Sequence, residues 1–435
     1  MTYDAARESE QLRLNNDAIN AFLVRYGNKN LPPAQRKTVF LFPGGMGSEL
    51  RRATNPYDDS NPGQQFEFET VWLTWETFLA NRSFELQMTR LADGVYRDKD
   101  DRIIVAVGPV DLAGVTPYSG FTAWCDLNNI DWFIVGCDWR RRLADSQAFF
   151  LNSLLPEFRI KFPIQANGLD PLGRIYLVGH SAGGMVVNSI LRSGNSPFAT
   201  FEKFITVGTP FYGYGGQLHR WTEGESLLNG PADIFRPKIV RVLTSFPGCY
   251  EWHYADEATF AADWASLTGD PRFPINSYPS LDESSSQPAD PYHPVTQFAG
   301  LFLRYPPNFL TGFKNAELSA AGNEVSRLAA PLPDPALVPK FFNIRGVGAA
   351  ADTVSSVRWK FMTPPYVQLT RPCLLQEPII DDPVLVPGDG VQPAWTTRLA
   401  SLPAAQTPAV QLQFFEHMLM MNDPAVLNQL GALIP

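Results

Sequence analysis

The sequence is poor in the residue patterns that mark metal, redox and disulfide chemistry. Its 435 residues include only four cysteines and five histidines. No Cys-x-x-Cys pair and no His-Glu-x-x-His or His-x-His spacing occurs. We therefore expect no metal site and no cofactor, and we expect the cysteines to be buried thiols. These cysteines are Cys125, Cys137, Cys249 and Cys373.

Basic clusters and long apolar segments are also missing. No Lys/Arg-rich run occurs and the formal net charge is -9, which argues against a nucleic-acid partner and against strong attraction to anionic membranes. No apolar run approaches the roughly 18 residues of a membrane-spanning helix. Residues 1–18 lack the apolar core of a signal peptide. We expect a cytoplasmic protein without a strong membrane anchor; its oligomeric state is left open.

The composition is globular, and the chain alternates between strand and helix patterns. Hydrophobic residues make up 45% of it and charged residues 18%, which is typical of a protein with a large core. Short apolar runs bounded by turn residues predict buried strands at KTVFLF, RIIVAVGP, DWFIVGCDW, RIYLVGHS, FEKFITVGTP, FFNIRGVG and VQLQFFEH. Helical patterns between several of them predict a mostly parallel sheet with helices on both faces.

Three other segments have patterns of their own. Residues 2–26 and the aromatic segment FEFETVWLTWETFL at 66–79 are both predicted to be helical. From about 212 to 340 the chain is rich in Gly, Pro and aromatic residues and has few strand-like runs. We interpret 212–340 as a lid or cap inserted into a single domain that spans 1–435. Its aromatic residues include Trp221, Tyr250, Trp252, Phe260 and Trp264.

The segment RIYLVGHSAGGMVVNSILRSGN, which begins at Arg174, contains a G-x-S-x-G motif centred on Ser181. A predicted strand precedes the motif and a predicted helix over 185–191 follows it, which is the setting of a nucleophile elbow. In such a turn the serine adopts a strained conformation, small neighbours are needed, and the hydroxyl projects at a helix N-terminus that favours negative charge. The alternative is an ordinary tight turn.

A serine hydroxyl needs a base, and in this arrangement the chain order is Ser, acid, His. His417 follows the last predicted strand and precedes a helix that opens at Asp423-Pro424, the place expected for the base. Asp389 and Asp352 both follow strands; we favour Asp389 because its Gly-Asp-Gly turn can aim the carboxylate at an imidazole. Either aspartate could instead form a turn. The other histidines outside the motif, interpreted as surface or interfacial, are His219, His253 and His293.

Two backbone N–H groups should form an oxyanion hole. One is expected from Ala182, the residue after the nucleophile, and the other from the loop in VFLFPGGMG, where Gly45 or Met46 would supply it. The sequence does not separate Gly45 from Met46. A glycine-rich turn is the alternative interpretation. The loop is not a dinucleotide fingerprint, because G-x-G-x-x-G is absent.

An ordered set of segments resembles the lecithin:cholesterol acyltransferase family, a group of α/β-hydrolases that includes lysosomal phospholipases and phospholipid:diacylglycerol acyltransferases. The segments are VFLFPGGMGSEL, FETVWLTWETFL, GCDWRRR, LVGHSAGG, ITVGTPFYG, LTSFPGCYEW, FFNIRGVG, PGDGVQP and FFEHMLMMNDPAV. The resemblance covers residues 39–426. It implies the α/β-hydrolase fold and a triad of Ser181, Asp389 and His417.

The Asp-Trp-Arg segment at 138–140 is similar to one that shapes the family's active-site rim, and structural packing is the alternative. The chain has no cysteine between 50 and 66, so the disulfide-closed loop that helps secreted members attach to lipid surfaces is not stapled here. The expected function is acyl transfer from a hydrophobic ester, as a lipid esterase or phospholipase if water attacks and as an acyltransferase if an alcohol attacks. The alternatives are a cytosolic esterase or lactonase acting on a soluble hydrophobic metabolite, and a non-catalytic binding protein with this fold.

Overall fold

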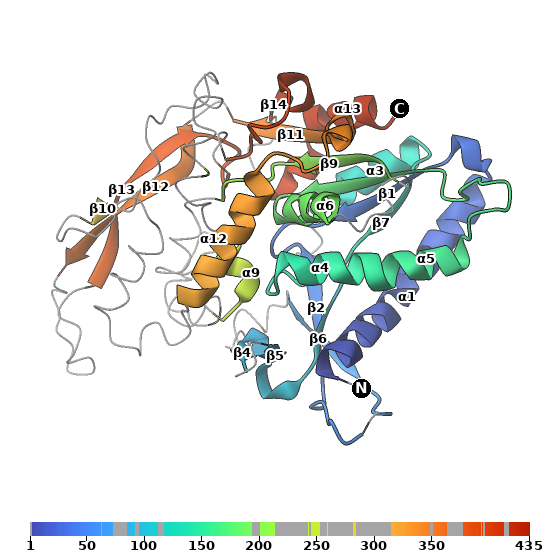
Figure 1. Cartoon of the computed structure of the whole chain (residues 1–435), viewed down its shortest axis with the longest axis horizontal. Coiled ribbons are helices and arrows are strands. Elements are labelled where there is room, and N and C mark those ends of the chain that lie inside the picture. Colours follow the sequence, from blue (N-terminus) through green and yellow to red (C-terminus); the bar gives the residue numbers. More distant parts are fainter. Residues whose placement is uncertain are drawn as a thin grey trace. The chain divides into compact units, whose positions relative to one another are not determined.

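In the computed structural model the chain forms two compact units. The first comprises Met1–Thr209, Leu332–Gly346 and Leu402–Pro435, and the second comprises Pro210–Pro331 and Val347–Ser401. Figure 1 shows the helices and strands coloured along the sequence. The structure describes residues 2–61, 63–72, 85–91, 95–111, 117–193, 201–213, 242, 245–252, 259, 282–283, 315–348, 351–362, 377–392, 394, 396–412 and 417–435. Of 282–283, 315–319, 351–362 and 377–387 it describes the backbone alone. Much of the predicted lid, including Trp221, Phe260 and Trp264, lies outside the described residues.

A six-stranded sheet in the order β14-β11-β9-β8-β1-β7 forms the centre of the first unit. Its strands are β1 (Lys37–Phe42), β7 (Asp131–Ile134), β8 (Arg174–His180), β9 (Phe201–Val207), β11 (Phe341–Val347) and β14 (Ala409–Gln411). The pairs β7–β1, β1–β8, β8–β9 and β9–β11 are all parallel. The sequence predicted a strand at each of these positions, although β14 ends at Gln411 and His417 lies in η9 (His417–Asn422) instead of in the predicted strand VQLQFFEH. The mostly parallel sheet is confirmed.

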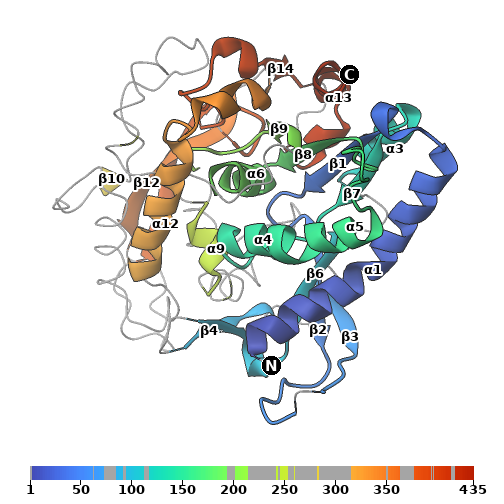
Figure 2. The ribbon, with the colours of Figure 1, turned by 45° about the vertical axis from the view of Figure 1, so that its right-hand side comes forward.

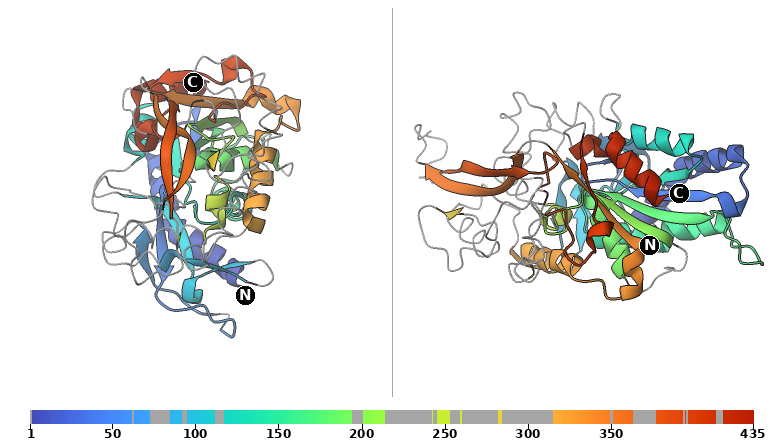
Figure 3. Two further views of the ribbon diagram at one scale, coloured as in Figure 1. Left: turned by 90° about the vertical axis from the view of Figure 1, so that its left-hand side faces the viewer. Right: turned by 90° about the horizontal axis from the view of Figure 1, so that it is seen from above.

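Helices cover both faces of this sheet. They are α1 (Tyr3–Lys29), α3 (Ser119–Leu127), α4 (Leu143–Phe149), the π-turn η4 (Phe150–Leu154), α5 (Leu155–Lys161), α6 (Ala182–Arg192), η9 (His417–Asn422) and α13 (Pro424–Leu433). Helices α4, α5 and α6 lie in front of the sheet in Figures 1 and 2. Helix α13, in red, lies on the other side of the strands (Figure 3, right). None of the described helices is both long enough and apolar enough to cross a membrane.

Strand β1 shows how the sheet buries both of its faces. Val39 and Leu41 join a buried cluster with side chains of α3 and α13. Phe40 points to the opposite face, where its ring packs edge-on against Phe150 and Phe158, with ring centroids 5.4 and 5.0 Å away. Successive strand residues face opposite sides, so a strand covered on both faces reads as a continuous apolar run. Each such buried side chain contributes roughly 1.5–3 kcal/mol.

Two predicted elements differ in the structure. RIIVAVGP forms β6 (Ile104–Pro109), which pairs antiparallel with β2 (Ser48–Ala53) in a separate three-stranded sheet. The helix predicted at 66–79 is wrong at its start, because β3 (Phe68–Trp72) is a strand that pairs antiparallel with β2; residues 73–79 lie outside the described residues. An apolar run predicts burial but not the sheet it joins. The run Thr70, Val71, Trp72 consists of residues that favour strands.

The remaining elements are short or belong to the second unit. In the first unit they are η1 (Pro33–Gln35), β4 (Met88–Arg90), β5 (Tyr96–Asp98), η3 (Lys99–Asp101), η7 (Pro335–Lys340) and η8 (Ala404–Gln406). In the second unit they are α9 (Pro247–Tyr250), β10 (Asp282–Glu283), α12 (Asn315–Ala329), β12 (Ala351–Met362) and β13 (Glu377–Pro387). Strands β12 and β13 pair antiparallel, and β10 adds a third strand beside β12.

Candidate active site

Ser181 lies in the sharp turn between β8 and α6, and its backbone is strained. Its φ is 52° and its ψ is -127°, a combination that residues with a Cβ rarely adopt. The Ser181 N–H donates to the carbonyl oxygen of Val207 at 2.8 Å, and the side chain makes no capping hydrogen bond to α6. The predicted strand–turn–helix is confirmed. Ser181 stands at the N-terminus of α6, where unbonded N–H groups favour negative charge.

The glycines around Ser181 are required by close backbone contacts. A Cβ added to Gly179 would lie 2.5 Å from the carbonyl oxygen of Gly183, and a Cβ on Gly183 would overlap the carbonyl oxygen of Phe42. A Cβ on Gly44 would lie only 2.9 Å from the Cβ of Ser181. The strand, the helix and the loop after β1 therefore meet at Ser181, which is the crowding that the motif predicts.

In the loop after β1, the N–H groups at the two ends, those of Gly44 and Gly47, donate hydrogen bonds. Gly47 donates to the carbonyl oxygen of Gly44 at 3.0 Å, and Gly44 donates to the hydroxyl of Tyr118 at 2.9 Å. Met46 has a φ of 65°. Within the described part of the chain, the N–H groups of Gly45 and Met46 make no hydrogen bond. Gly45 and Met46 therefore both remain candidates for the second oxyanion donor, and Ala182 is the candidate for the first.

Trp72 holds the carbonyl side of this loop. Its indole N–H donates to the carbonyl oxygen of Met46 at 3.0 Å, and its ring packs against Trp139 with centroids 5.1 Å apart. Both indoles are buried. Trp139 is the central residue of the Asp-Trp-Arg segment. This segment therefore contacts the loop indirectly, through the ring of Trp72.

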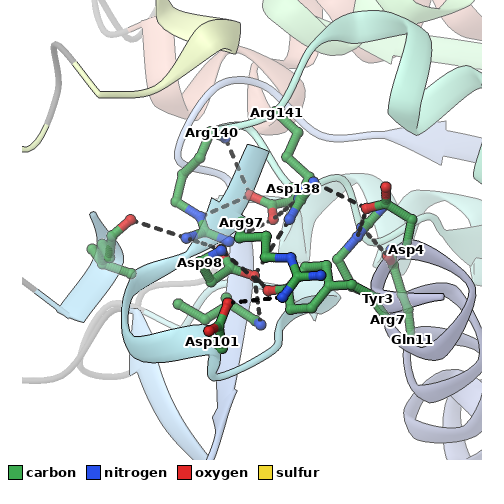
Figure 4. Close-up of polar contacts among 12 residues, drawn as sticks. Tyr3, Asp4, Arg7, Gln11, Arg97, Asp98, Asp101, Asp138, Arg140 and Arg141 are labelled. Atoms are coloured by element: carbon green, nitrogen blue, oxygen red, sulfur yellow. Dashed lines mark hydrogen bonds and ion pairs between the residues drawn. The ribbon is translucent and has the colours of Figure 1, made fainter. Parts of the chain in front are cut away.

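Arg140 is fully buried between carboxylates (Figure 4). It donates to Asp138 from Nε at 2.9 Å and from Nη2 at 2.7 Å, and its Nη1 lies 2.9 Å from Asp98. Tyr3 donates its hydroxyl to Asp98 at 2.7 Å. Burial by itself would raise the pKa of Asp98, but Arg140 and Arg141 outweigh burial and hold that pKa at about 2. Asp138 and Arg140 are thus members of a buried ion-pair cluster in the first unit.

His417, the predicted base, is the first residue of η9 and is buried. Its carbonyl oxygen lies 3.0 Å from Nε2 of His180, and the two imidazole centroids are 5.0 Å apart. Since His180 directly precedes Ser181, η9 begins beside the residue before the predicted nucleophile; the pairing of the His417 imidazole with the Ser181 hydroxyl stays a prediction. The helix expected after His417 is also confirmed, because Asp423 caps α13 by accepting the N–H of Ala425 at 2.8 Å.

Asp389, the predicted acid, belongs to the second unit and follows β13 in the expected turn. Its Oδ1 accepts the N–H groups of Val391 at 3.1 Å and Gln392 at 2.6 Å, which is the turn-forming use of aspartate. Asp352, the other candidate, lies in β12, where the backbone alone is described. Because Asp389 and His417 belong to different units, their pairing stays a prediction.

The histidines set aside as surface or interfacial lie outside the described residues; they are His219, His253 and His293. Among the residues that the structure describes, no three His, Cys, Asp or Glu side chains are grouped to hold a metal ion. Cys125, Cys137 and Cys249 are buried, as expected, and Cys373 lies outside the described residues.

Tyr118 and His180 are two residues of the site that the sequence analysis missed. The Tyr118 hydroxyl lies 3.2 Å from Nδ1 of His180, and both side chains are buried. Burial, followed by the neighbouring His417, lowers the pKa of His180 well below its ordinary value, although the hydrogen bond to the His417 carbonyl opposes this. No motif includes Tyr118, and His180 occupies a position that the motif leaves open.

His180→Gln is expected to make the protein less sensitive to mild acid. The folded pKa of His180 lies below its ordinary value of 6.5, so the neutral residue contributes its full stability above about pH 6.5 and loses it as the pH falls toward the folded pKa. Below pH 6.5 the wild type should lose up to about 1.4 kcal/mol more per pH unit than the variant. Urea unfolding from pH 7.5 to 5 measures this, and parallel curves for the two proteins would contradict it.

Comparisons with known proteins bear on the fold. No protein-family model and no curated protein sequence matches the chain. The crystal structure of the Tle4–Tli4 complex matches it with a TM-score of 0.50 and 12% identity, covering 92% of this chain and 98% of that chain. Lipase 1 from Pelosinus fermentans aligns over 92% of this chain and 97% of its own, with 12% identity and a TM-score of 0.32. The α/β-hydrolase fold is confirmed; the narrower resemblance to the lecithin:cholesterol acyltransferase family stays a prediction.

Proposed function

We propose that the protein is a serine hydrolase that cleaves carboxylic esters through an acyl-enzyme, with Ser181 as nucleophile, His417 as base and Asp389 as acid. The strained backbone of Ser181 at the start of α6, with Gly44 against its Cβ, carries this proposal. Such a conformation costs about 1–3 kcal/mol. An ordinary turn from strand to helix does not require it, whereas a projecting nucleophile does.

In the first half-reaction, Oγ of Ser181 attacks the ester carbonyl carbon while His417 takes the hydroxyl proton. The carbonyl electron pair moves onto oxygen, where the N–H groups of Ala182 and of Gly45 or Met46 stabilise it. The carbon–oxygen bond to the alcohol then breaks, and the alcohol leaves with the proton from His417. Asp389 orients the imidazole and stabilises its charged form.

In the second half-reaction, water gives a proton to His417 and attacks the acyl-enzyme, so that the acid leaves and Ser181 regains its proton. If an alcohol takes the place of water, the same steps transfer the acyl group to that alcohol. The protein would then act as an acyltransferase. The groups around Ser181 serve both outcomes equally, so the acceptor has to be found by experiment.

For the substrate we propose a hydrophobic ester, either a lipid or another acyl ester. The resemblance to lecithin:cholesterol acyltransferases and the aromatic content of 212–340 support this class, and we propose that 212–340 forms a cap. Tyr250 and Trp252 from that segment belong to the second unit and are buried.

A fluorophosphonate probe is expected to label wild-type protein covalently at Ser181, since the probe reacts only with an activated serine held beside an oxyanion hole. Mass spectrometry of the labelled peptide identifies the site. Ser181→Ala should abolish this labelling. A folded wild-type protein that takes up no probe would contradict the proposal and favour the non-catalytic binding protein.

The substrate class is tested by comparing phospholipid vesicles with p-nitrophenyl esters of short and long acyl chains, each with and without an added alcohol. Turnover of vesicles supports a lipid substrate. Turnover of soluble esters alone favours the esterase or lactonase. Formation of a new ester in the presence of the alcohol identifies acyl transfer, and Ser181→Ala serves as the control in every arm.

A further inference from the structure

A chain of hydrogen bonds connects the three backbone segments that meet at Ser181. The N–H of Gly44 donates to the hydroxyl of Tyr118 at 2.9 Å, and that hydroxyl lies 3.2 Å from Nδ1 of His180. On the far side of the ring, Nε2 of His180 lies 3.0 Å from the carbonyl oxygen of His417. All of these residues are buried in the first unit. The loop after β1, the serine turn and η9 are therefore linked in series.

The partners allow only one direction for these bonds. A carbonyl oxygen only accepts, so Nε2 of His180 must carry the ring proton and donate it to His417. Nδ1 of the neutral ring is then an acceptor, and the Tyr118 hydroxyl donates to it. Burial raises the pKa of Tyr118 above its ordinary value, so the phenol keeps its proton. The oxygen of Tyr118 in turn accepts the N–H of Gly44.

We propose that Tyr118 and His180 are positioning residues, which hold the loop bearing Gly45 and Met46 and the backbone of His417 in place around the hydroxyl of Ser181. This inference rests on the function proposed for Ser181. Neither side chain touches the reacting atoms in this account. They act through the two backbone segments that supply the oxyanion donors and the base.

A second contact supports the role of the segment that begins at Tyr118. The N–H of Gly120, in the first turn of α3, donates to the side-chain oxygen of Asn422 at 2.8 Å. A Cβ on Gly120 would lie 2.9 Å from that oxygen, so the two segments are packed tightly. Asn422 is the last residue of η9 and His417 is the first. The segment that carries the base is thus held at both ends by bonds that lead to the start of α3.

Loss of this chain should affect the transition state more than substrate binding. Oxyanion donors and a general base act mainly on the charge that develops as the reaction proceeds. A displacement of such groups by about 1 Å can cost about 100-fold in rate. We therefore expect kcat per folded molecule to fall while KM changes little. Circular dichroism gives the folded fraction, because partial unfolding alone would also lower the apparent kcat at constant KM.

Tyr118→Phe tests whether the hydrogen bonds of Tyr118 position the site, and Tyr176→Phe is the matched control. Each change removes one buried hydroxyl, but the hydroxyl of Tyr176 has no hydrogen-bond partner in the described part of the structure. We expect Tyr118→Phe to lower both kcat and the rate constant of fluorophosphonate labelling about 10- to 100-fold. KM should stay within about 2-fold of wild type. Tyr176→Phe should change neither rate.

His180 is tested by two substitutions that each keep one half of the chain. The amide of asparagine reaches the level of Nδ1 and can keep the contact with Tyr118, whereas the amide of glutamine reaches the level of Nε2 and can keep the contact with His417. His180→Gln should therefore lower kcat as Tyr118→Phe does, and its kcat/KM should depend on pH as in the wild type. His180→Asn should shift the acidic limb of the kcat/KM profile, because it loosens the segment that carries the base.

The possible results are distinct. If Tyr118→Phe behaves like Tyr176→Phe, or if its loss of rate only follows a loss of folded protein seen by circular dichroism, the inference is overturned. If wild-type protein neither labels nor hydrolyses any ester, the proposed function fails instead. In that case the ¹⁵N NMR spectrum of His180 still tests the hydrogen-bond series from Gly44 to His417. A ring protonated at Nε2 supports the series, and a ring protonated at Nδ1 overturns it.

Discussion

Replacing Ser181 by alanine is expected to lower kcat for ester hydrolysis by about 10⁴- to 10⁶-fold. Without Oγ no acyl-enzyme forms, and only the oxyanion donors and substrate binding remain to assist direct attack by water. KM should change little, because the serine contributes mainly in the transition state. A chromogenic ester gives kcat and KM for both proteins. Ser193→Ala is the control, since the Ser193 hydroxyl donates to the nearby carbonyl oxygen of Ile190 at 2.9 Å and lies at the far end of α6 from Ser181. A Ser181→Ala protein with wild-type kcat would exclude the serine mechanism.

The partners of Ser181 are tested in the same assay. His417→Ala should lose about as much as Ser181→Ala, and the double variant should lose no more, because the two residues act as one unit. Asp389→Asn should lower kcat by about 10⁴-fold, while Asp352→Asn should leave it near wild type. The opposite result would assign the acid to Asp352 and leave Asp389 as a turn residue.

Arg140→Met is expected to lower the free energy of unfolding by about 3–5 kcal/mol. The substitution removes the cation that lies 2.7 Å from Asp138 and 2.9 Å from Asp98 and leaves those carboxylates buried with less compensation. Chemical denaturation followed by tryptophan fluorescence measures the change. Arg51→Met is the matched control, because Arg51 pairs with Glu49 in a partly exposed ion pair, and such pairs contribute at most about 1 kcal/mol. Equal losses in the two variants would show that the buried cluster contributes no more than a surface pair.

The same cluster should confer resistance to acid. The pKa of Asp98 is about 2 in the folded protein against an ordinary value of 3.8. Its contribution is therefore fully present above about pH 4 and is lost as the pH falls toward 2. Asp98→Asn should lower stability at neutral pH and flatten the dependence on pH between 4 and 2.

The sequence predictions were correct where an element depends on residues a few positions apart, and they were less accurate where it depends on pairing with a distant strand. The strand before Ser181, the helix after it and the Asp423 cap were predicted correctly, because capping and the G-x-S-x-G turn involve residues a few positions apart. β6 was predicted as a strand but assigned to the wrong sheet, since burial does not reveal which strand is the partner. The aromatic segment 66–79 was predicted to be helical, whereas residues 68–72 form a strand that pairs with β2.

By itself, the sequence determined where most strands of the central sheet lie along the chain and the turn that carries Ser181; the role of His417 as base stays a prediction. Only the tertiary structure decided that Gly44, Tyr118, His180 and His417 form one hydrogen-bonded chain. It also decided that Arg140 is buried between Asp138, which is close to it in the sequence, and Asp98, which is far from it. The physical reason is that a side chain's partners depend on which backbone segments the sheet brings together. The spacing of residues in the sequence predicts such partners only when they belong to the same turn.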